Sequence, residues 1–134
     1  MGACRIGFDT VPTSDAPEIP VDVPVDAPRV CPADTVAIAP QSTVCIELVQ
    51  RGYDPWTVAR DTCATLGRRL CADAEWLMAC ETAPTGLMDM VGPGYEWVAE
   101  ESGGIAQKRG ASSCQDPSSH QVIDPYDWRC CVDR

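Results

Sequence analysis

The chain has 134 residues, which allows one domain of about 100 residues and a tail. Its 20 acidic and 10 basic side chains give a formal net charge of −10. Such a surface repels phosphate backbones and anionic lipid heads, so nucleic acid and direct membrane binding are disfavoured. No apolar run approaches the ~18 residues that a membrane span needs.

The nine cysteines indicate disulfides and an oxidising compartment. They include no CxxC pair, and only one histidine accompanies them, so a tetrahedral zinc site is disfavoured. Without Cys4, eight cysteines remain, an even number that could close four bridges.

The chain divides by composition into residues 1–30 and a domain over residues 31–134. Five prolines and four acidic residues alternate over residues 12–28. Proline fixes the backbone and the acids repel one another, so we expect an extended, solvated tether. The first four residues, Met-Gly-Ala-Cys, match the end of a bacterial lipoprotein signal, in which Cys4 receives lipid. The basic and apolar regions of such a signal do not precede it, so a free N-terminal cysteine is the alternative.

Residues 35–39 and 44–49 are β-rich runs separated by Pro-Gln-Ser-Thr, which predicts a hairpin. Cys31 and Cys45 flank this hairpin and could close it covalently.

Two helices follow. The first is predicted from Asp54 as N-cap and Pro55 at the first helical position to an end at Gly67. The second is predicted over residues 73–81. Their inward faces would carry Trp56, Ala59, Cys63 and Leu66 on the first helix, and Trp76, Leu77 and Cys80 on the second.

The remainder predicts short strands at residues 95–98, near 109–114 and at 128–132. Ser118, Ser119 and His120 have the composition of a polar turn, and Gly103-Gly104 is an ordinary turn signal. Strands, two helices and further strands predict an α+β domain.

Four motifs then occur in order. They are Cys-Ala-Thr-Leu-Gly-Arg-Arg-Leu-Cys-Ala-Asp-Ala-Glu-Trp-Leu-Met-Ala-Cys at 63–80, Asp-Met-Val-Gly-Pro-Gly-Tyr-Glu-Trp at 89–97, Arg-Gly-Ala-Ser at 109–112 and Asp-Trp-Arg-Cys at 127–130. Together they resemble the formylglycine-generating-enzyme (sulfatase-modifying factor) family. The resemblance implies a C-type-lectin-like fold, in which the first and last strands pair and two helices flank small sheets.

The resemblance also implies three disulfides beside the hairpin's Cys31–Cys45. Cys63 would pair with Cys130, Cys80 with Cys114, and Cys71 with Cys131. Spacing alone allows many other connectivities. Each bridge would stabilise the domain by about 2–4 kcal/mol.

The resemblance also implies a possible copper site. In enzymes of this family, copper is held between two cysteines just after an Arg-Gly-Gly-Ser segment. Soft thiolates suit Cu(I), but here the segment offers only Cys114 and His120. No thiolate remains if Cys114 bridges Cys80, and copper is therefore disfavoured. The stretch between Cys80 and Asp89 is also much shorter than in the enzymes.

The loop at residues 89–96 resembles the family's calcium loop. Carried over, Asp89 and Glu96 would give carboxylates, and Gly92 and Gly94 main-chain carbonyls, to a hard cation such as calcium. Pro93 replaces the family's asparagine, and a solvated acidic turn is the alternative.

These observations predict a monomeric, non-catalytic binding or structural module, secreted or lipid-anchored at the bacterial cell envelope. Its ligand would be a protein or a glycan. Membrane contact would come only through a lipid at Cys4. The alternative is a minimal copper-dependent oxidase of the formylglycine-generating type.

Overall fold

The computed structural model describes residues 30–134, so Cys4 and the predicted tether lie outside the described residues. The elements follow in the order β1 (Thr35–Ala37), β2 (Val44–Glu47), β3 (Gly52–Pro55), α1 (Trp56–Thr65), β4 (Arg69–Leu70), α2 (Asp73–Thr82), β5 (Glu96–Ser102), β6 (Ile105–Arg109), β7 (Pro117–Gln121), β8 (Pro125–Trp128) and β9 (Cys130–Asp133). Over this range, neither helix is long and apolar enough to cross a membrane.

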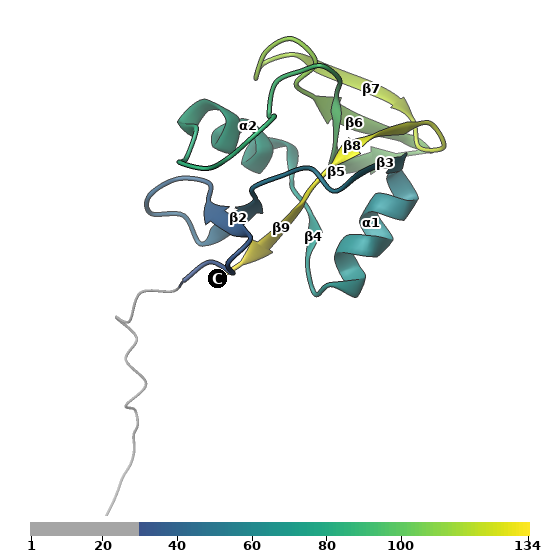
Figure 1. Ribbon diagram of the computed structural model, residues 1–134. Helices are drawn as coiled ribbons and strands as arrows, with labels where there is room; N and C mark the ends of the chain where they lie inside the picture. Colours follow the sequence, from purple (N-terminus) through teal and green to yellow (C-terminus); the bar gives the residue numbers. More distant parts are fainter. Residues whose placement is uncertain (1–29) are drawn as a thin grey trace, which may run out of the picture.

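The strands form two small sheets (Figure 1). The first is antiparallel, in the order β1-β2-β9-β4, and the second has the order β3-β8-β5-β6-β7, with β5 and β8 parallel. The β1–β2 hairpin is the one predicted from residues 35–49. Its second strand pairs with the last strand of the chain, Ile46 opposite Cys131. The α+β prediction is confirmed.

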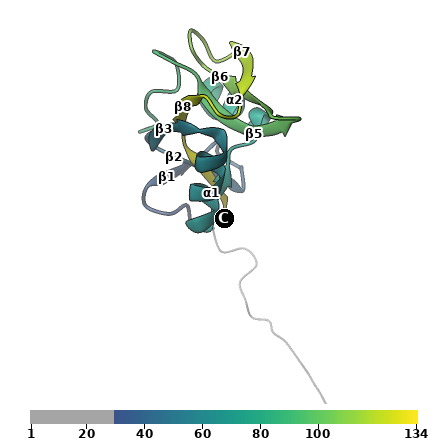
Figure 2. The same cartoon turned by 90° about the vertical axis from the view of Figure 1, so that its right-hand side faces the viewer.

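The two helices lie on opposite sides of the central strands, as both ribbon views show (Figures 1 and 2). Each helix covers its own apolar cluster. The α2 cluster comprises Ile38, Ile46, Cys71, Trp76, Ala79, Cys80, Met90, Val98 and Cys131. The α1 cluster comprises Trp56, Ala59, Cys63, Leu70, Trp97, Ala106, Trp128 and Cys130. All four tryptophans also donate their indole N–H to a main-chain carbonyl or a carboxylate across the fold.

Strand β9 joins the two clusters through its adjacent cysteines. Successive side chains of a strand point to opposite faces, so Cys130 reaches Cys63 on α1 while Cys131 reaches Cys71 before α2. The other bridges are Cys31–Cys45 and Cys80–Cys114. These four pairs are the same as those that the hairpin and the family resemblance imply.

The prediction of Asp54 as the N-cap of the first helix is wrong. Asp54 belongs to β3, and its carboxylate accepts a hydrogen bond from the Trp128 indole N–H at 2.9 Å. The cap position is Pro55, and the first helical N–H, that of Trp56, is satisfied by the Val122 carbonyl. At the other end, Leu66 lies beyond the helix and is 46 % exposed, so it is not part of the inward face.

Two strand predictions in the C-terminal third need correction. The strand expected near 109–114 is β6, which ends at Arg109 because Gly110 has a φ of 95°. Residues 118–120 are not a turn but the middle of β7, in which Ser118 lies opposite Lys108. The strand expected at 128–132 is two strands, β8 and β9, in different sheets.

Candidate functional site

The predicted calcium loop converges on a buried ion pair. Glu96 is 1 % exposed, and its carboxylate bonds to the Arg129 guanidinium at 2.9 and 2.8 Å. The Trp76 indole N–H and the Gln50 amide complete its hydrogen bonds, at 3.1 and 2.9 Å.

Arg129 also bridges the segments around this pair. Its remaining N–H groups donate to main-chain carbonyls at the end of β2 and in the loop before β5, those of Glu47, Leu48, Met88 and Asp89. All its N–H groups therefore have acceptors. Together with the Met88 N–H bond to the Leu48 carbonyl, Arg129 links the loop over residues 83–95 to the end of β2.

These contacts bear on the four predicted calcium ligands. Of the two predicted carboxylates, that of Glu96 already accepts hydrogen bonds from Arg129. Arg129 also bonds to the main-chain carbonyl of Asp89, and Gly92 donates its N–H to the Gly110 carbonyl at 2.7 Å, so these two contacts leave the Asp89 carboxylate and the predicted carbonyls of Gly92 and Gly94 unused. Calcium takes six to eight oxygen ligands, and it would have to compete with a guanidinium for Glu96, so the calcium site stays a prediction and we derive no role from it.

Close to this pair, the charged form of the Asp127 carboxyl is disfavoured. Burial, followed by repulsion from the Glu96 carboxylate, raises the pKa of Asp127, and Arg129 only partly offsets these effects. Asp127 was not singled out in the sequence, because its neighbours come from β5 and from the loop before it.

The predicted vestigial copper ligands are on different sides of the fold. Cys114 is bonded to Cys80 and packs against the α2 cluster. His120 lies on β7, 2.6 Å from Asp124, with its ring 5.6 Å from that of Tyr126, which packs against the α1 cluster. Across residues 30–134, no three His, Cys, Asp or Glu side chains are grouped as metal ligands.

A buried lysine was missed in the sequence. Lys108 is 4 % exposed, and its ammonium lies over the rings of Tyr126 and Tyr95, 3.8 and 4.2 Å from their centroids. Aromatic faces attract a cation and stabilise it where water is excluded. Buried and exposed side chains alternate along β6, and this alternation places Lys108 on the same buried face as Ala106. On the neighbouring strands, Lys108 lies directly opposite Trp97 and Ser118.

A pocket of about 240 Å³ opens between α1 and the strands below it, and we call it the α1 pocket. It is lined by Trp56, Arg60, Ala64, Arg68, Arg69, Leu70 and Ala99. Its base is apolar and three guanidinium groups stand around it, with Arg60 stacked 5.2 Å from the centre of the Trp56 ring. Concave apolar sites with a few polar groups are the usual form of a ligand pocket.

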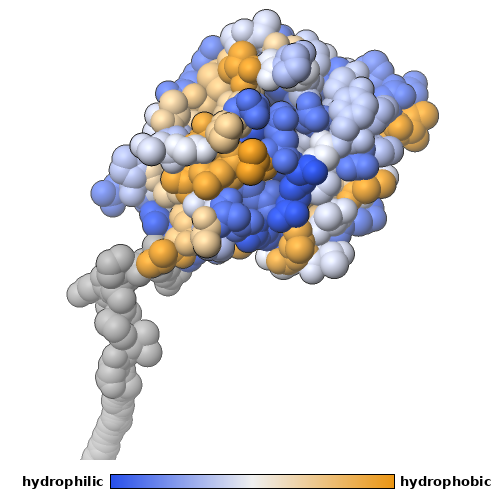
Figure 3. All heavy atoms as spheres, in the orientation of Figure 1, coloured by the Kyte–Doolittle hydropathy of each residue, from blue (hydrophilic) through white to orange (hydrophobic). Residues whose placement is uncertain are grey.

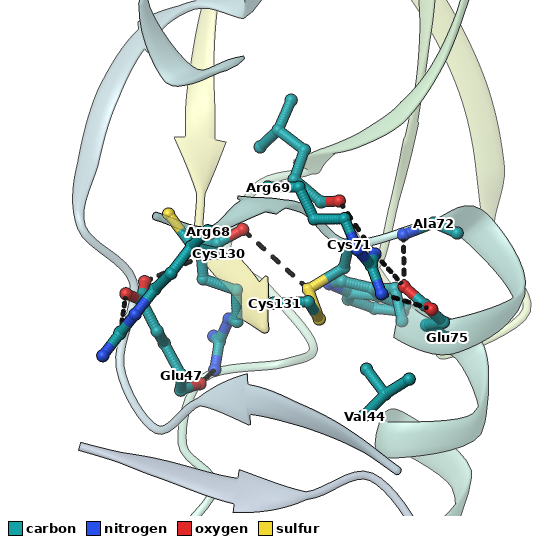
Figure 4. Close-up of a disulfide and its surroundings, with 12 residues drawn as sticks. Val44, Glu47, Arg68, Arg69, Cys71, Ala72, Glu75, Cys130 and Cys131 are labelled. Atoms are coloured by element: carbon teal, nitrogen blue, oxygen red, sulfur yellow. Dashed lines mark hydrogen bonds and ion pairs between the residues drawn. A yellow bond between two sulfur atoms is a disulfide. The ribbon is translucent and has the colours of Figure 1, made fainter. Parts of the chain in front are cut away.

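Two of these arginines are fixed by carboxylates, as Figure 4 shows for Glu47 and Glu75. Arg68 bonds to Asp34 through both terminal nitrogens, at 2.9 and 2.8 Å, and to Glu47. Arg69 bonds to Glu75 at 2.6 and 2.8 Å and to Asp133 at 3.0 Å. These bonds raise the pKa of both guanidinium groups and hold their planes as rigid walls.

Glu47, the carboxylate partner of Arg68, is buried in the interior. It is 3 % exposed and takes hydrogen bonds from Arg51, from Arg68 and from the Cys130 N–H at 2.8 Å. A buried carboxylate with three such donors is well compensated, so Glu47 joins the end of β2 to Arg68, just before β4, and to the start of β9.

Comparison with known proteins adds no relative. No protein-family model matches the chain, and no curated protein matches it. The family resemblance therefore rests on the four motifs and stays a prediction.

Proposed function

We propose that this chain is a non-catalytic, extracytoplasmic binding or structural module, a degenerate relative of the formylglycine-generating-enzyme domain with a C-type-lectin-like fold. The observation that carries the proposal is the state of the sulfur atoms. All eight cysteines of residues 30–134 are in disulfides, and a Cu(I) site of the family type needs thiolates.

The scaffold supports a role in display. Four bridges tie both helices, the first hairpin and the last strand together, and each adds about 2–4 kcal/mol to a domain of modest size. Disulfides of this density belong to an oxidising compartment. We place the module outside the cytoplasm, monomeric, on the acidic tether, with a lipid at Cys4 as the route to the cell envelope.

The binding role takes its support from surface chemistry. The α1 pocket joins an apolar base to fixed guanidinium groups, which suits a protein ligand with apolar and acidic groups. Its walls are held by ion pairs, so little ordering of the protein would accompany binding.

Thiol titration tests the proposal. The full chain is purified from an oxidising compartment, denatured without reductant and reacted with a chromophoric thiol reagent. We expect at most one thiol per chain, from Cys4, and none in the Cys4→Ser variant. A reduced sample provides the control, because all nine cysteines then react.

The oxidase alternative is tested in the same material. The folded chain is incubated with copper and a sulfatase-type cysteine peptide, and oxygen uptake and peptide mass are followed. We expect neither oxygen uptake nor peptide oxidation. Copper-dependent oxidation, or two or more thiols in the native protein, would replace the binding module by the oxidase.

A further inference from the structure

We propose that the outer face of β5, β6 and β7, the side turned away from α1, binds an exposed lysine side chain of a partner protein. The inference rests on the proposed binding function and names the chemistry of the ligand. Side chains alternate along β6, so that Ala106 is buried in the α1 cluster while Ile105 and Gln107 are exposed on the outer face. A hollow of about 300 Å³ opens there, lined by Glu100, Glu101, Ser102, Ile105, Gln107 and Ser119.

A bulge in β5 brings two consecutive carboxylates to this hollow. Successive side chains of a regular strand point to opposite faces, so the sheet would separate Glu100 from Glu101. The pairing of β5 with β6 shifts its register between Trp97 and Glu101, and a bulge of this kind changes the direction in which side chains point. Glu100 and Glu101 consequently line the same hollow.

Main-chain contacts hold both carboxylates in place. Glu100 accepts the Asp73 N–H at 2.8 Å, and Glu101 accepts the Gly104 N–H at 2.9 Å, each through one oxygen. The second oxygen of each carboxylate is left for a ligand. Because the two side chains are already ordered, binding would cost little conformational entropy at this site.

The basic side chains of β6 and α1 have other partners. Arg109 bonds to Asp73, and Arg60 bonds to Asp61. Lys108 belongs to the buried face of β6, the side opposite the hollow. The two glutamates attract Arg60 and Arg109 only at longer range, so a close cation has to come from a ligand.

Lysine matches the hollow in both its charge and its stem. The ammonium group has three N–H donors that rotate together, which suits acceptors on separate side chains, here the two glutamates and the Ser102 hydroxyl. Ile105 is 44 % exposed and offers an apolar surface for the four-carbon stem. At about 300 Å³ the hollow is at the lower end of the range for ligand pockets, so it suits one side chain and not a large ligand.

The partner has to be a different protein. The only lysine of the chain is Lys108, which is 4 % exposed, so no lysine of a second copy can reach the hollow. In both ribbon views, β7 lies at the end of the molecule opposite the C-terminus and the start of the described chain (Figures 1 and 2). The hollow is therefore presented at the end that is far from these attachment points.

The charge of the domain favours the same kind of partner. Residues 31–134 carry 15 acidic and 8 basic side chains, and this excess of negative charge attracts a basic protein from a distance. On the face that Figure 3 shows, apolar patches are separated by hydrophilic surface. That face therefore offers no large continuous apolar interface as a competing mode of docking.

An NMR titration of the full chain tests the site. The isotope-labelled Cys4→Ser protein, with its bridges closed, is titrated at low salt with an end-capped penta-lysine peptide. We expect saturable shifts of the Ser102, Ile105 and Gln107 amides, and no shift of the Val132 amide in the other sheet. The same peptide with acetylated side-chain amines should cause no shifts, because it keeps the stems and loses the charges.

Two double variants separate the site from the net charge. Glu100→Gln with Glu101→Gln removes both carboxylates but keeps an oxygen for each main-chain N–H that they accept. Glu81→Gln with Asp133→Asn, on other elements, changes the net charge by the same amount. We expect the first pair to weaken penta-lysine binding about tenfold, the effect of two exposed ion pairs, and the second pair to weaken it less than about twofold.

Three results would overturn the inference. One is the absence of saturable shifts at the hollow. Another is an equal loss of affinity in the two double variants, because binding would then depend on net charge alone. The third is equal affinity for penta-arginine, because lysine would then not be the ligand that the hollow selects. In each case, four closed bridges and no oxidase activity would leave the proposed function standing.

Discussion

Replacing Arg129 by methionine should cost more stability than any other single charge removal in this domain. Its side chain is fully buried, with the Glu96 carboxylate 1 % exposed beside it. Removing one partner of a buried pair leaves an uncompensated charge and typically costs about 3–5 kcal/mol. Here four main-chain carbonyls would each lose the hydrogen bond from Arg129 as well, although those of Leu48 and Asp89 keep a second donor. Because small domains have a margin of about 5–15 kcal/mol, we expect a loss of at least about a fifth of it.

The assay is urea unfolding followed by far-ultraviolet circular dichroism without reductant, so that all four bridges stay closed. Arg129→Met should lower the midpoint at an unchanged slope. The matched control is the double variant Glu96→Gln with Arg129→Met. Because it removes the stranded charge, it should be less destabilised than the sum of the two single variants, with a coupling of about 1–3 kcal/mol.

Two outcomes would refute the reasoning. If Arg129→Met cost less than about 0.5 kcal/mol, the value of an ordinary surface change, the guanidinium would be hydrated and not buried. If the double variant were additive, Glu96 and Arg129 would not be stabilising each other.

Three further predictions concern neighbouring positions. Gly110→Ala should destabilise the domain by about 1–3 kcal/mol more than Gly103→Ala. Both glycines have a positive φ. A Cβ at Gly110 would lie 2.5 Å from the Met90 carbonyl oxygen and 2.6 Å from the Trp76 ring, whereas a Cβ at Gly103 would have nothing within 4 Å. Equal losses in urea would contradict the steric reason. Asp127→Asn should stabilise the domain at neutral pH by a few tenths of a kcal/mol, since the carboxyl is partly solvated. The folded pKa of Asp127 lies above the unfolded value of 3.8, so its ionisation costs stability as pH rises through that window, and the variant's advantage should vanish below it. An advantage that persists in acid would exclude this cause. Millimolar calcium should leave the melting temperature unchanged, because Arg129 holds the Glu96 carboxylate and the Asp89 carbonyl. A melting temperature that rises with calcium but not with magnesium would show that the ion displaces the arginine.

The sequence by itself determined the parts of the fold that depend on neighbouring residues. The hairpin over 35–49 followed from two β-rich runs around a turn, and the second helix from a period that places Trp76 and Cys80 on one face. Eight cysteines after Cys4 implied four bridges. The pairing of Cys31 with Cys45 came from the hairpin that they flank, and the other three pairs came from the motifs, because spacing cannot tell which strands will be adjacent.

Tertiary structure decided what depends on distant pairing. Residues 118–120 have no intrinsic preference for a strand, and they form β7 because β6 offers hydrogen-bonding groups along its edge. Asp54 would have capped α1, but a partner 74 residues away, Trp128, takes its carboxylate. The α1 pocket and the Arg129 pair likewise collect side chains from separate elements, since burial of a charge is set by what the whole fold packs around it.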